Sequence, residues 1–434
     1  MKPLSVSLAI TGAFFLASTI VLAITQAPLG SPVFFACAAG AGIAYIAMLR
    51  RVWHEPRASP RLLTSAFLLA LAFRAPLVVP PVGPDSDMER YLWDGRLQTL
   101  GYNPYAMVPA DPALAALHTD ETRAMPSIRT RTPYPPAAQL FFRLVASIHD
   151  STLAMKVALV LCDLLTMIVL WRWLVFTGRS EWLALAYAWN PLVVLEVAHS
   201  GHIDALGALW ITASAYWLAR RRTALASIAF VLAVATKLLP IVLVPLYWKR
   251  VRLRDAAAGS ALLAALYVAF TTNGTLPLGA VPNVVAHIRF NGPLFRTIMR
   301  AGNPQAAALV AVALGMGTAI WARWKLDADD AAAWGWPMAV ALACAPVIYP
   351  WYLLYLTPFL FTAATLPLTA WTCTVLSTYV VWHIARQGGR WVVPTGLMWI
   401  EYGVPAVLAA LQALRSRNSV NVMDPVEPSG SVER

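Results

Sequence analysis

Apolar runs recur along this chain from Leu4 to Leu414. Each is close to the roughly 20 residues that a helix needs to cross the hydrocarbon core of a bilayer. Of the 434 residues, 59% are hydrophobic and only 12% are charged, which lies outside the balance of a soluble domain. The sequence therefore predicts an all-α polytopic membrane helix bundle of roughly 12 to 13 spans. It excludes a soluble enzyme and a nucleic-acid-binding domain.

The formal net charge of +12 has a simple explanation in a membrane protein. Arg and Lys gather in the short loops between the apolar runs, where they hold those loops on the cytoplasmic side. We therefore expect no nucleic-acid partner. The cysteines lie within apolar segments without a paired spacing, and we interpret them as small buried hydrophobic residues. They are Cys37, Cys162, Cys344 and Cys373.

The basic loops also predict the orientation of the spans. With a cytoplasmic N-terminus and an uncleaved first span, the run 220–222 stays inside and the polar stretches 81–152 and 273–302 face outward. Loops as long as 81–152 are usually functional. Residues 1–414 then form a single membrane domain, and residues 415–434 form a disordered cytoplasmic tail. The predicted spans lie near 5–25, 33–49, 62–80, 153–172, 182–198, 203–219, 256–272, 303–322, 333–349, 352–366, 368–385 and 393–414.

The segment 223–247 breaks the alternation of the spans. A single span there would separate the basic run 220–222 from the basic run 249–254, although both should lie inside. Two half-helices resolve the conflict, with Lys237 at the midpoint and Pro240 just after it. A continuous helix with one loop that violates the positive-inside trend is the alternative.

The first outward loop opens with the signature of a helix. Ser86 and Glu89 have the spacing of a capping box, which predicts that Ser86 is the N-cap and that Asp87 lies in the first turn, where its ionised form is favoured. A carboxylate beside cations at the lipid–water boundary can accept a proton from a substrate hydroxyl. An ordinary amphipathic interfacial helix is the alternative. The residues expected on the same face as Asp87 are Arg90, Tyr91 and Asp94. Turn segments farther on, 101–105 and 132–136, predict that this loop is ordered.

Other candidates lie on later segments. His199, His202 and Asp204 cluster at the outer end of two predicted spans, but they are a weak ligand set for a metal. Lys237 is deep in a span, which marks a functional site by default, and we favour a phosphate as its partner. The second outward loop combines cations with aromatic residues, which suits an anionic lipid headgroup; ordinary interface anchoring is the alternative. These residues are Arg289, Phe290, Asn291, Phe295, Arg296 and Arg300.

Together these segments resemble a known family. The stretch 87–96, reading DMERYLWDGR, is followed by GYNPY at 101–105. This motif is fairly specific, and it resembles the first outward loop of GT-C superfamily glycosyltransferases, particularly the bacterial polyprenyl-phosphate-mannose-dependent type. Other short segments match the family in their order along the chain and in the side of the membrane on which they lie, although each match is weak alone. They are Tyr134-Pro135-Pro136, Gly201-His202-Ile203-Asp204-Ala205, Lys237-Leu238-Leu239-Pro240, Phe290-Asn291-Gly292 and Tyr349-Pro350-Trp351-Tyr352.

The resemblance implies an inverting hexosyltransferase of the cell envelope. Such an enzyme moves a hexose, by family analogy mannose, from a polyprenyl-phosphate donor to an acceptor hydroxyl on a lipid or glycan. It works at the outer face of the bacterial inner (cytoplasmic) membrane, in contact with membrane lipid.

The catalytic Asp of that family maps to Asp87. Family members often carry two adjacent acidic residues, whereas Ser86 precedes Asp87 here, so a share for Asp85 and the use of a divalent cation stay open. We assign no metal ligands. The residues predicted to bind substrate are Asp85, Arg90, Tyr91, Asp94, Arg96, Asn103, Tyr105, Tyr134, His202, Asp204, Lys237, Arg289, Asn291 and Arg296.

A secondary transporter or a flippase of a lipid-linked or anionic substrate is the alternative function. It too would have about a dozen spans, a broken helix and an intramembrane lysine. Transporters seldom need a large ordered loop between spans, and the two halves of this chain have no convincing self-similarity. The sequence therefore favours the transferase.

Overall fold

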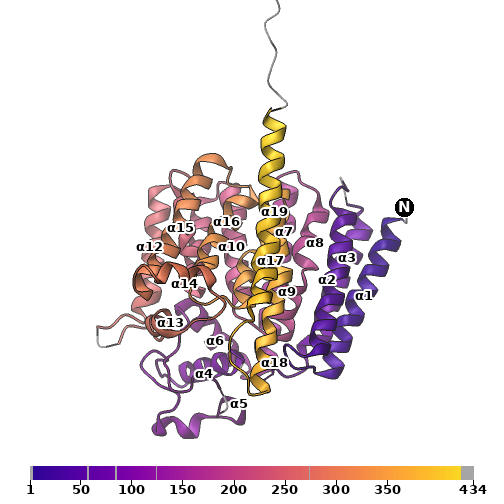
Figure 1. Cartoon of the computed structure of the whole chain (residues 1–434). Coiled ribbons are helices and arrows are strands. Elements are labelled where there is room, and N and C mark those ends of the chain that lie inside the picture. Colours follow the sequence, from indigo (N-terminus) through magenta and orange to yellow (C-terminus); the bar gives the residue numbers. More distant parts are fainter. Residues whose placement is uncertain (1–2, 56–57, 84–85, 124, 273, 422–434) are drawn as a thin grey trace, which may run out of the picture.

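The computed structural model describes residues 3–55, 58–83, 86–123, 125–272 and 274–421, and over these ranges the chain folds into a helical bundle (Figure 1). The β-structure in these ranges consists of isolated bridges. The predicted all-α membrane bundle is confirmed. Within the described ranges, seven segments are long and apolar enough to cross a membrane: α1 (Leu4–Thr25), α2 (Pro32–Val52), α3 (Pro60–Val78), α7 (Thr152–Phe176), α15 (Pro304–Lys325), the segment Ala363–Arg386, and Thr395–Leu414 within α19 (Thr395–Asn421).

Several other predicted spans are built from shorter helices placed end to end. In the predicted span 182–198 the cause is Pro191, which lacks an N–H and disfavours helical backbone at Asn190 before it. The Asn190 side chain accepts a hydrogen bond from the Leu192 N–H (3.0 Å), and a π-helix, η3 (Val194–His199), follows. The other short helices of the bundle are η2 (Glu181–Ala184), α8 (Leu185–Ala188), α9 (Pro191–Val193), α10 (Asp204–Ala219), α12 (Leu253–Val268), α16 (Ala331–Ala343), η5 (Pro350–Tyr355), η6 (Thr357–Phe359), η7 (Ala363–Thr365), α17 (Leu366–Thr374), η8 (Val375–Tyr379) and α18 (Val380–Arg386).

The predicted pair of half-helices over 223–247 is confirmed. The first piece is α11 (Thr223–Thr236), and the second is the 3-10 helix η4 (Leu239–Tyr247). They meet at Lys237, whose backbone is extended (φ −158°, ψ 145°). Pro240 contributes to the break because it offers no N–H to a continuing helix.

This hairpin returns to the end of the bundle from which it starts. Thr223 at its beginning donates a hydrogen bond to Asp255, which follows the hairpin. The basic runs 220–222 and 249–254 therefore lie at one end of the molecule, which we call the basic end. The alternative of a continuous helix is wrong, and Lys237 lies at the tip of the hairpin.

The long loops gather at the opposite end, which we call the loop end (residues 86–152 and 274–302; lower part of Figure 1). The two loops are joined directly, because the Ala280 N–H donates a hydrogen bond to the Thr132 carbonyl (3.0 Å). Both stretches predicted to face outward thus lie together, away from the basic end. Their helices are α4 (Met88–Thr99), η1 (Pro112–Leu117), α5 (Asp120–Arg123), α6 (Pro136–Ile148), α13 (Val281–His287) and α14 (Pro293–Met299).

The first loop is ordered because it has a small hydrophobic core of its own. The Trp93 ring stacks on His118 with centroids 3.9 Å apart, and His118 Nε2 lies 2.9 Å from the Pro109 carbonyl. The prediction of an ordered loop is confirmed. The buried residues of this core are Trp93, Leu97, Leu114 and Met125.

The last helix extends beyond its expected end. The sequence predicts disorder from residue 415, but α19 continues to Asn421, since no proline or glycine interrupts it after Pro405 within the described residues. Residues 422–434, the remainder of the predicted tail, lie outside the described ranges. The helix runs along the outside of the bundle toward the basic end (Figure 1).

A buried ion pair links the third and fourth long helices. Arg74 of α3 donates from Nε and Nη2 to the Asp163 carboxylate of α7, and the Tyr187 hydroxyl donates to the same carboxylate (2.7 Å). Both charged side chains are almost fully buried. Breaking such a pair leaves an uncompensated buried charge.

We therefore expect Asp163→Asn to lower the free energy of unfolding by about 3–5 kcal/mol. The matched control is Glu55→Gln, which removes the partly exposed pair between Arg51 and Glu55 and should cost less than about 1 kcal/mol. Thermal unfolding in detergent measures both. Equal unfolding midpoints for the two variants would contradict this account of the Arg74 pair.

Candidate active site

Asp87 stands at the N-terminus of α4, at the loop end. The helix begins at Met88, one residue later than expected, and Ser86 Oγ accepts a hydrogen bond from the Met88 N–H (3.0 Å). Because Ser86 satisfies this free N–H, the Asp87 carboxylate is not needed for capping. The Asp87 side chain remains 35% exposed. Asp85, the other carboxylate predicted for this site, lies outside the described residues.

The surroundings of Asp87 favour its ionised form. Burial raises the pKa of the Asp87 carboxyl, but the neighbouring His202, Lys237 and Tyr134 side chains favour the carboxylate and together outweigh burial. The pKa of Asp87 therefore lies below its ordinary value. At neutral pH this residue is a carboxylate that can accept a proton.

His202 is held against Asp87 from several directions. Its Nδ1 lies 3.8 Å from Asp87 Oδ2, and its Nε2 lies 3.3 Å from Glu196 Oε2. Its ring stacks on Trp351 with centroids 4.0 Å apart and planes 8° from parallel. The preceding Gly201 has φ +72°, and a Cβ there would lie 2.4 Å from the Met88 side chain. Glycine adopts this left-handed backbone conformation without the strain that a side chain would bring.

Lys237, at the tip of the hairpin, is the cation of the site. Its Nζ donates a hydrogen bond to Asp204 Oδ1 (2.7 Å) and lies 3.7 Å from the centroid of the Tyr352 ring. The Asp204 side chain is fully buried, while that of Lys237 is 22% exposed. The charge of this intramembrane lysine is thus paired with a carboxylate. It also lowers the pKa of Asp87.

Two buried tyrosines connect α4 to these residues. The Ile203 N–H donates a hydrogen bond to the Tyr91 hydroxyl (3.3 Å), and the Tyr91 and Tyr134 rings meet edge to face at 5.1 Å. Burial raises the pKa of Tyr134 well above its usual value, so its hydroxyl stays protonated and can donate to Asp87. We call Asp87, Tyr134, His202, Asp204 and Lys237 the central cluster.

No group of three or more His, Cys, Asp or Glu side chains among the described residues is arranged to hold a metal ion. His199, considered with His202 and Asp204 as a ligand set, instead places Nδ1 3.4 Å from Ser200 Oγ.

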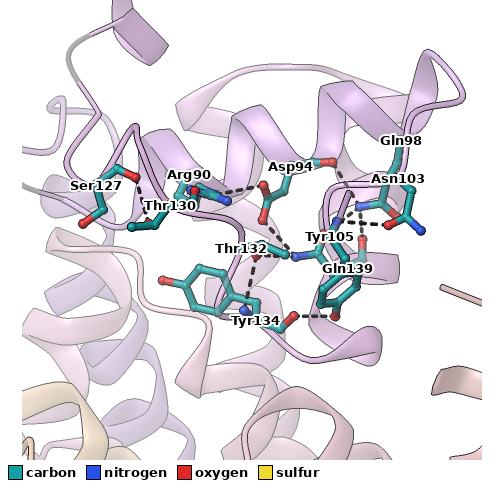
Figure 2. A network of polar contacts seen from close by, with 10 residues as sticks. All are labelled: Arg90, Asp94, Gln98, Asn103, Tyr105, Ser127, Thr130, Thr132, Tyr134 and Gln139. Carbon is teal, nitrogen blue, oxygen red and sulfur yellow. Dashed lines mark hydrogen bonds and ion pairs between the residues drawn. The ribbon is translucent and has the colours of Figure 1, made fainter. Parts of the chain in front are cut away.

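Arg90 and Asp94, predicted to bind substrate, are instead engaged with protein (Figure 2). The Asp94 carboxylate is fully buried and accepts hydrogen bonds from Arg90 Nε (2.9 Å) and Gln139 Nε2 (2.8 Å). Arg90 Nη1 donates to the Thr130 carbonyl (2.9 Å). These contacts join α4 to α6 and to the loop between them. They therefore hold in place the helix that begins directly after Asp87.

Arg96, Asn103 and Tyr105 also connect parts of the loop end. Arg96 Nε donates to Asp150 (2.6 Å), just before α7. The Asn103 amide donates to the Phe270 carbonyl (2.8 Å), at the start of the second outward loop. The Tyr105 hydroxyl donates to the Tyr134 carbonyl (2.6 Å), as Figure 2 shows. Of these contacts, that of Tyr105 reaches a member of the central cluster, through the backbone carbonyl of Tyr134.

The predicted residues of the second loop also lie apart from the central cluster. Arg289 donates to backbone carbonyls of α13 and stacks on Phe295 at 4.9 Å. Arg296 is exposed. The Asn291 amide is buried and donates to both carboxylate oxygens of Glu401 in α19 (2.9 Å each). Asn291 thus anchors the last helix to the second loop.

Comparison with known proteins decides the family. Residues 9–251, more than half of the chain, match the family described as alpha-(1->6)-mannopyranosyltransferase, N-terminal domain. The chain belongs to this mannosyltransferase family. No curated protein and no solved structure gives a significant match to it. The resemblance to GT-C mannosyltransferases is therefore confirmed, and the protein is a glycosyltransferase of the membrane.

The matched part of this mannosyltransferase contains the whole central cluster. Asp87, His202 and Lys237 all lie within residues 9–251, whereas Asn291 and Glu401 lie beyond them. The matched part thus supplies the members of the central cluster, whereas Trp351 and Tyr352, which pack on His202 and Lys237, come from beyond it.

Glu196 is a residue of the site that the sequence analysis missed. It is fully buried in η3, beside His202, and it accepts a hydrogen bond from the Tyr379 hydroxyl (2.6 Å). The signal was available, because Glu196 interrupts the apolar run 182–198, and an ionisable residue within a span marks a functional site by default. The same rule had singled out Lys237.

Proposed function

We propose that this protein transfers mannose from a polyprenyl-phosphate donor to a hydroxyl group of a lipid or glycan acceptor. Transfer inverts the anomeric carbon and takes place at the outer face of the bacterial cytoplasmic membrane. The observation that carries the proposal is the partly exposed, ionised Asp87 carboxylate in the same cluster as the Lys237 cation. Membership of a mannosyltransferase family supports mannose as the sugar.

The reaction is a single displacement at C1 of mannose. The acceptor oxygen forms a bond to C1 as the bond from C1 to the phosphate oxygen breaks, and the electron pair of that bond leaves with the polyprenyl phosphate. The acceptor proton passes to the Asp87 carboxylate, which acts as general base. Attack from the side opposite the phosphate inverts C1.

Lys237 suits the leaving phosphate. Negative charge grows on the phosphate as the bond breaks, and a cation already in place stabilises that charge without reorganisation. Asp204 and the Tyr352 ring hold the Lys237 ammonium in position before substrate arrives. Arg289 and Arg296, the other cations predicted for this role, lie outside the central cluster, so we assign the phosphate to Lys237.

The distribution of charge supports the outer face as the place of transfer. The central cluster lies at the loop end, and the basic runs 220–222 and 249–254 lie at the other end. Basic loops remain in the cytoplasm. This arrangement supports an outward-facing cluster, which a donor anchored in the membrane by its polyprenyl chain can reach. Family membership also favours transfer over the transporter or flippase alternative.

The test is to compare donors in membranes that overexpress the protein. We expect radiolabelled mannose to reach a lipid or glycan product from polyprenyl-phosphate mannose, and not from a nucleotide-linked mannose when synthesis of the lipid donor is blocked. The product should have the anomeric configuration opposite to that of the donor. Transfer from the nucleotide donor under that block, or retention of configuration, would overturn the proposal.

A further inference from the structure

A line of polar contacts runs from Asp87 into the core of the bundle. His202 lies between two carboxylates, with Nδ1 facing Asp87 (3.8 Å) and Nε2 facing Glu196 (3.3 Å). The other oxygen of Glu196 accepts a hydrogen bond from the Tyr379 hydroxyl (2.6 Å). Glu196 is fully buried and has no Lys or Arg partner among its contacts in the described residues. A buried carboxylate costs free energy, so its persistence here calls for a role.

We propose that Glu196 is a positioning residue for the transfer reaction: it fixes the His202 ring with Nδ1 toward Asp87. Tyr379, Glu196, His202 and Asp87 then act as one unit. This inference rests on the proposed function, in which Asp87 is the base.

The backbone is shaped to present this unit. Glu196 lies in a π-helical turn, a rare geometry that is frequent at functional sites. The His202 N–H returns to the Glu196 carbonyl (2.9 Å), so the two side chains leave the same turn. Stacking on Trp351 then restricts rotation of the His202 ring.

The other charged groups near His202 already have partners. Lys237 is paired with Asp204 (2.7 Å), and Lys156 of α7 donates to the carbonyls of Leu77 (2.7 Å) and Pro80 (2.8 Å). The carboxylates that face the two His202 ring nitrogens are those of Asp87 and Glu196. The titratable groups that surround it are Asp87 from α4, Lys156 from α7, Glu196 and His199 from η3, Asp204 from α10, Lys237 from the hairpin and Tyr379 from η8.

The test is Glu196→Gln, measured as kcat against pH with the full-length protein in proteoliposomes. We expect kcat to fall about 10- to 100-fold, the size of a general-base contribution that is partly lost. The acid limb of the profile, where kcat falls as the pH is lowered, should also move to higher pH. The nearby His202 side chain lowers the pKa of Asp87. If the ring is no longer held against Asp87, that pKa rises, and the base is then protonated at a higher pH.

Four further variants separate positioning from packing. Glu196→Asp keeps a carboxylate beside His202, so the acid limb of its pH profile should stay near that of wild type. Glu401→Gln removes another buried carboxylate, whose partners are Asn291 and Trp371, and it should leave the acid limb in place. Adding Glu196→Gln to His202→Asn should cost little beyond His202→Asn alone, because both changes act through one contact.

The outcomes distinguish this inference from the function on which it rests. A shifted acid limb in Glu196→Gln, absent in Glu401→Gln, supports it. A lower kcat in Glu196→Gln with an unmoved acid limb would overturn the inference, since Glu196 would then be only structural. Losses of kcat that add fully in the double variant with His202→Asn would overturn it as well. If Glu196→Gln fails to fold, the acid limbs of Glu196→Asp and His202→Asn are compared instead. A shift in Glu196→Asp as large as that in His202→Asn would also overturn the inference. Absence of transfer by wild type would instead refute the proposed function.

Discussion

Asp87→Asn is expected to lower kcat by at least about 10³-fold, within the range that general-base catalysis contributes. The amide has nearly the same shape as the carboxylate but cannot accept the acceptor proton. Stability should change little, because the Asp87 side chain is 35% exposed and makes no capping bond. The measurement is initial transfer rate at saturating donor, beside a thermal unfolding curve of each preparation.

The control for Asp87→Asn is Asp120→Asn, in the same loop. The Asp120 side chain is almost fully exposed, its ion pair with Arg123 is on the surface, and it lies outside the central cluster. We expect this variant to transfer mannose at the wild-type rate. A well-folded Asp87→Asn protein with more than about a tenth of wild-type kcat would exclude Asp87 as the base, given the size of such contributions.

Lys237→Met is expected to lower kcat/KM for the donor by about 10²- to 10³-fold, the usual loss when one preorganised group that stabilises transition-state charge is removed. Met keeps most of the side-chain volume but has no charge for the leaving phosphate. The substitution also leaves the buried Asp204 carboxylate without its partner, so some loss of stability is expected as well.

The double variant Lys237→Met with Asp204→Asn separates these two effects. Removing both charges should restore the unfolding midpoint, because no unpaired charge remains buried. Transfer should stay low, because the phosphate still lacks its cation. Recovery of transfer together with stability would mean that Lys237 serves only to neutralise Asp204.

The broken helix at Lys237 was predictable from local sequence. The basic runs on either side of 223–247 must lie at the same end, and Lys237 followed by Pro240 marks where the chain turns. The helix after Ser86 was predictable in the same way, with a boundary error of one residue. Both depend on residues close in sequence, where spacing and charge determine the outcome.

Contacts between distant segments were not predictable from spacing. Helical periodicity places Arg90 and Asp94 on one face, but it does not say whether that face meets substrate or Gln139, which lies 45 residues beyond Asp94. The Tyr379 bond to Glu196 spans 183 residues, and the Asn291 bond to Glu401 spans 110. Such pairings depend on how the helices pack, which a single sequence does not reveal.

The most direct test of the central claim uses purified protein in proteoliposomes, supplied with labelled polyprenyl-phosphate mannose and a membrane extract as the source of acceptor. Wild type and Asp87→Asn are compared at equal amounts of folded protein. The account predicts labelled product with wild type and almost none with Asp87→Asn, because transfer requires that carboxylate. Equal product from both proteins, or no product from wild type with any acceptor fraction, would contradict it.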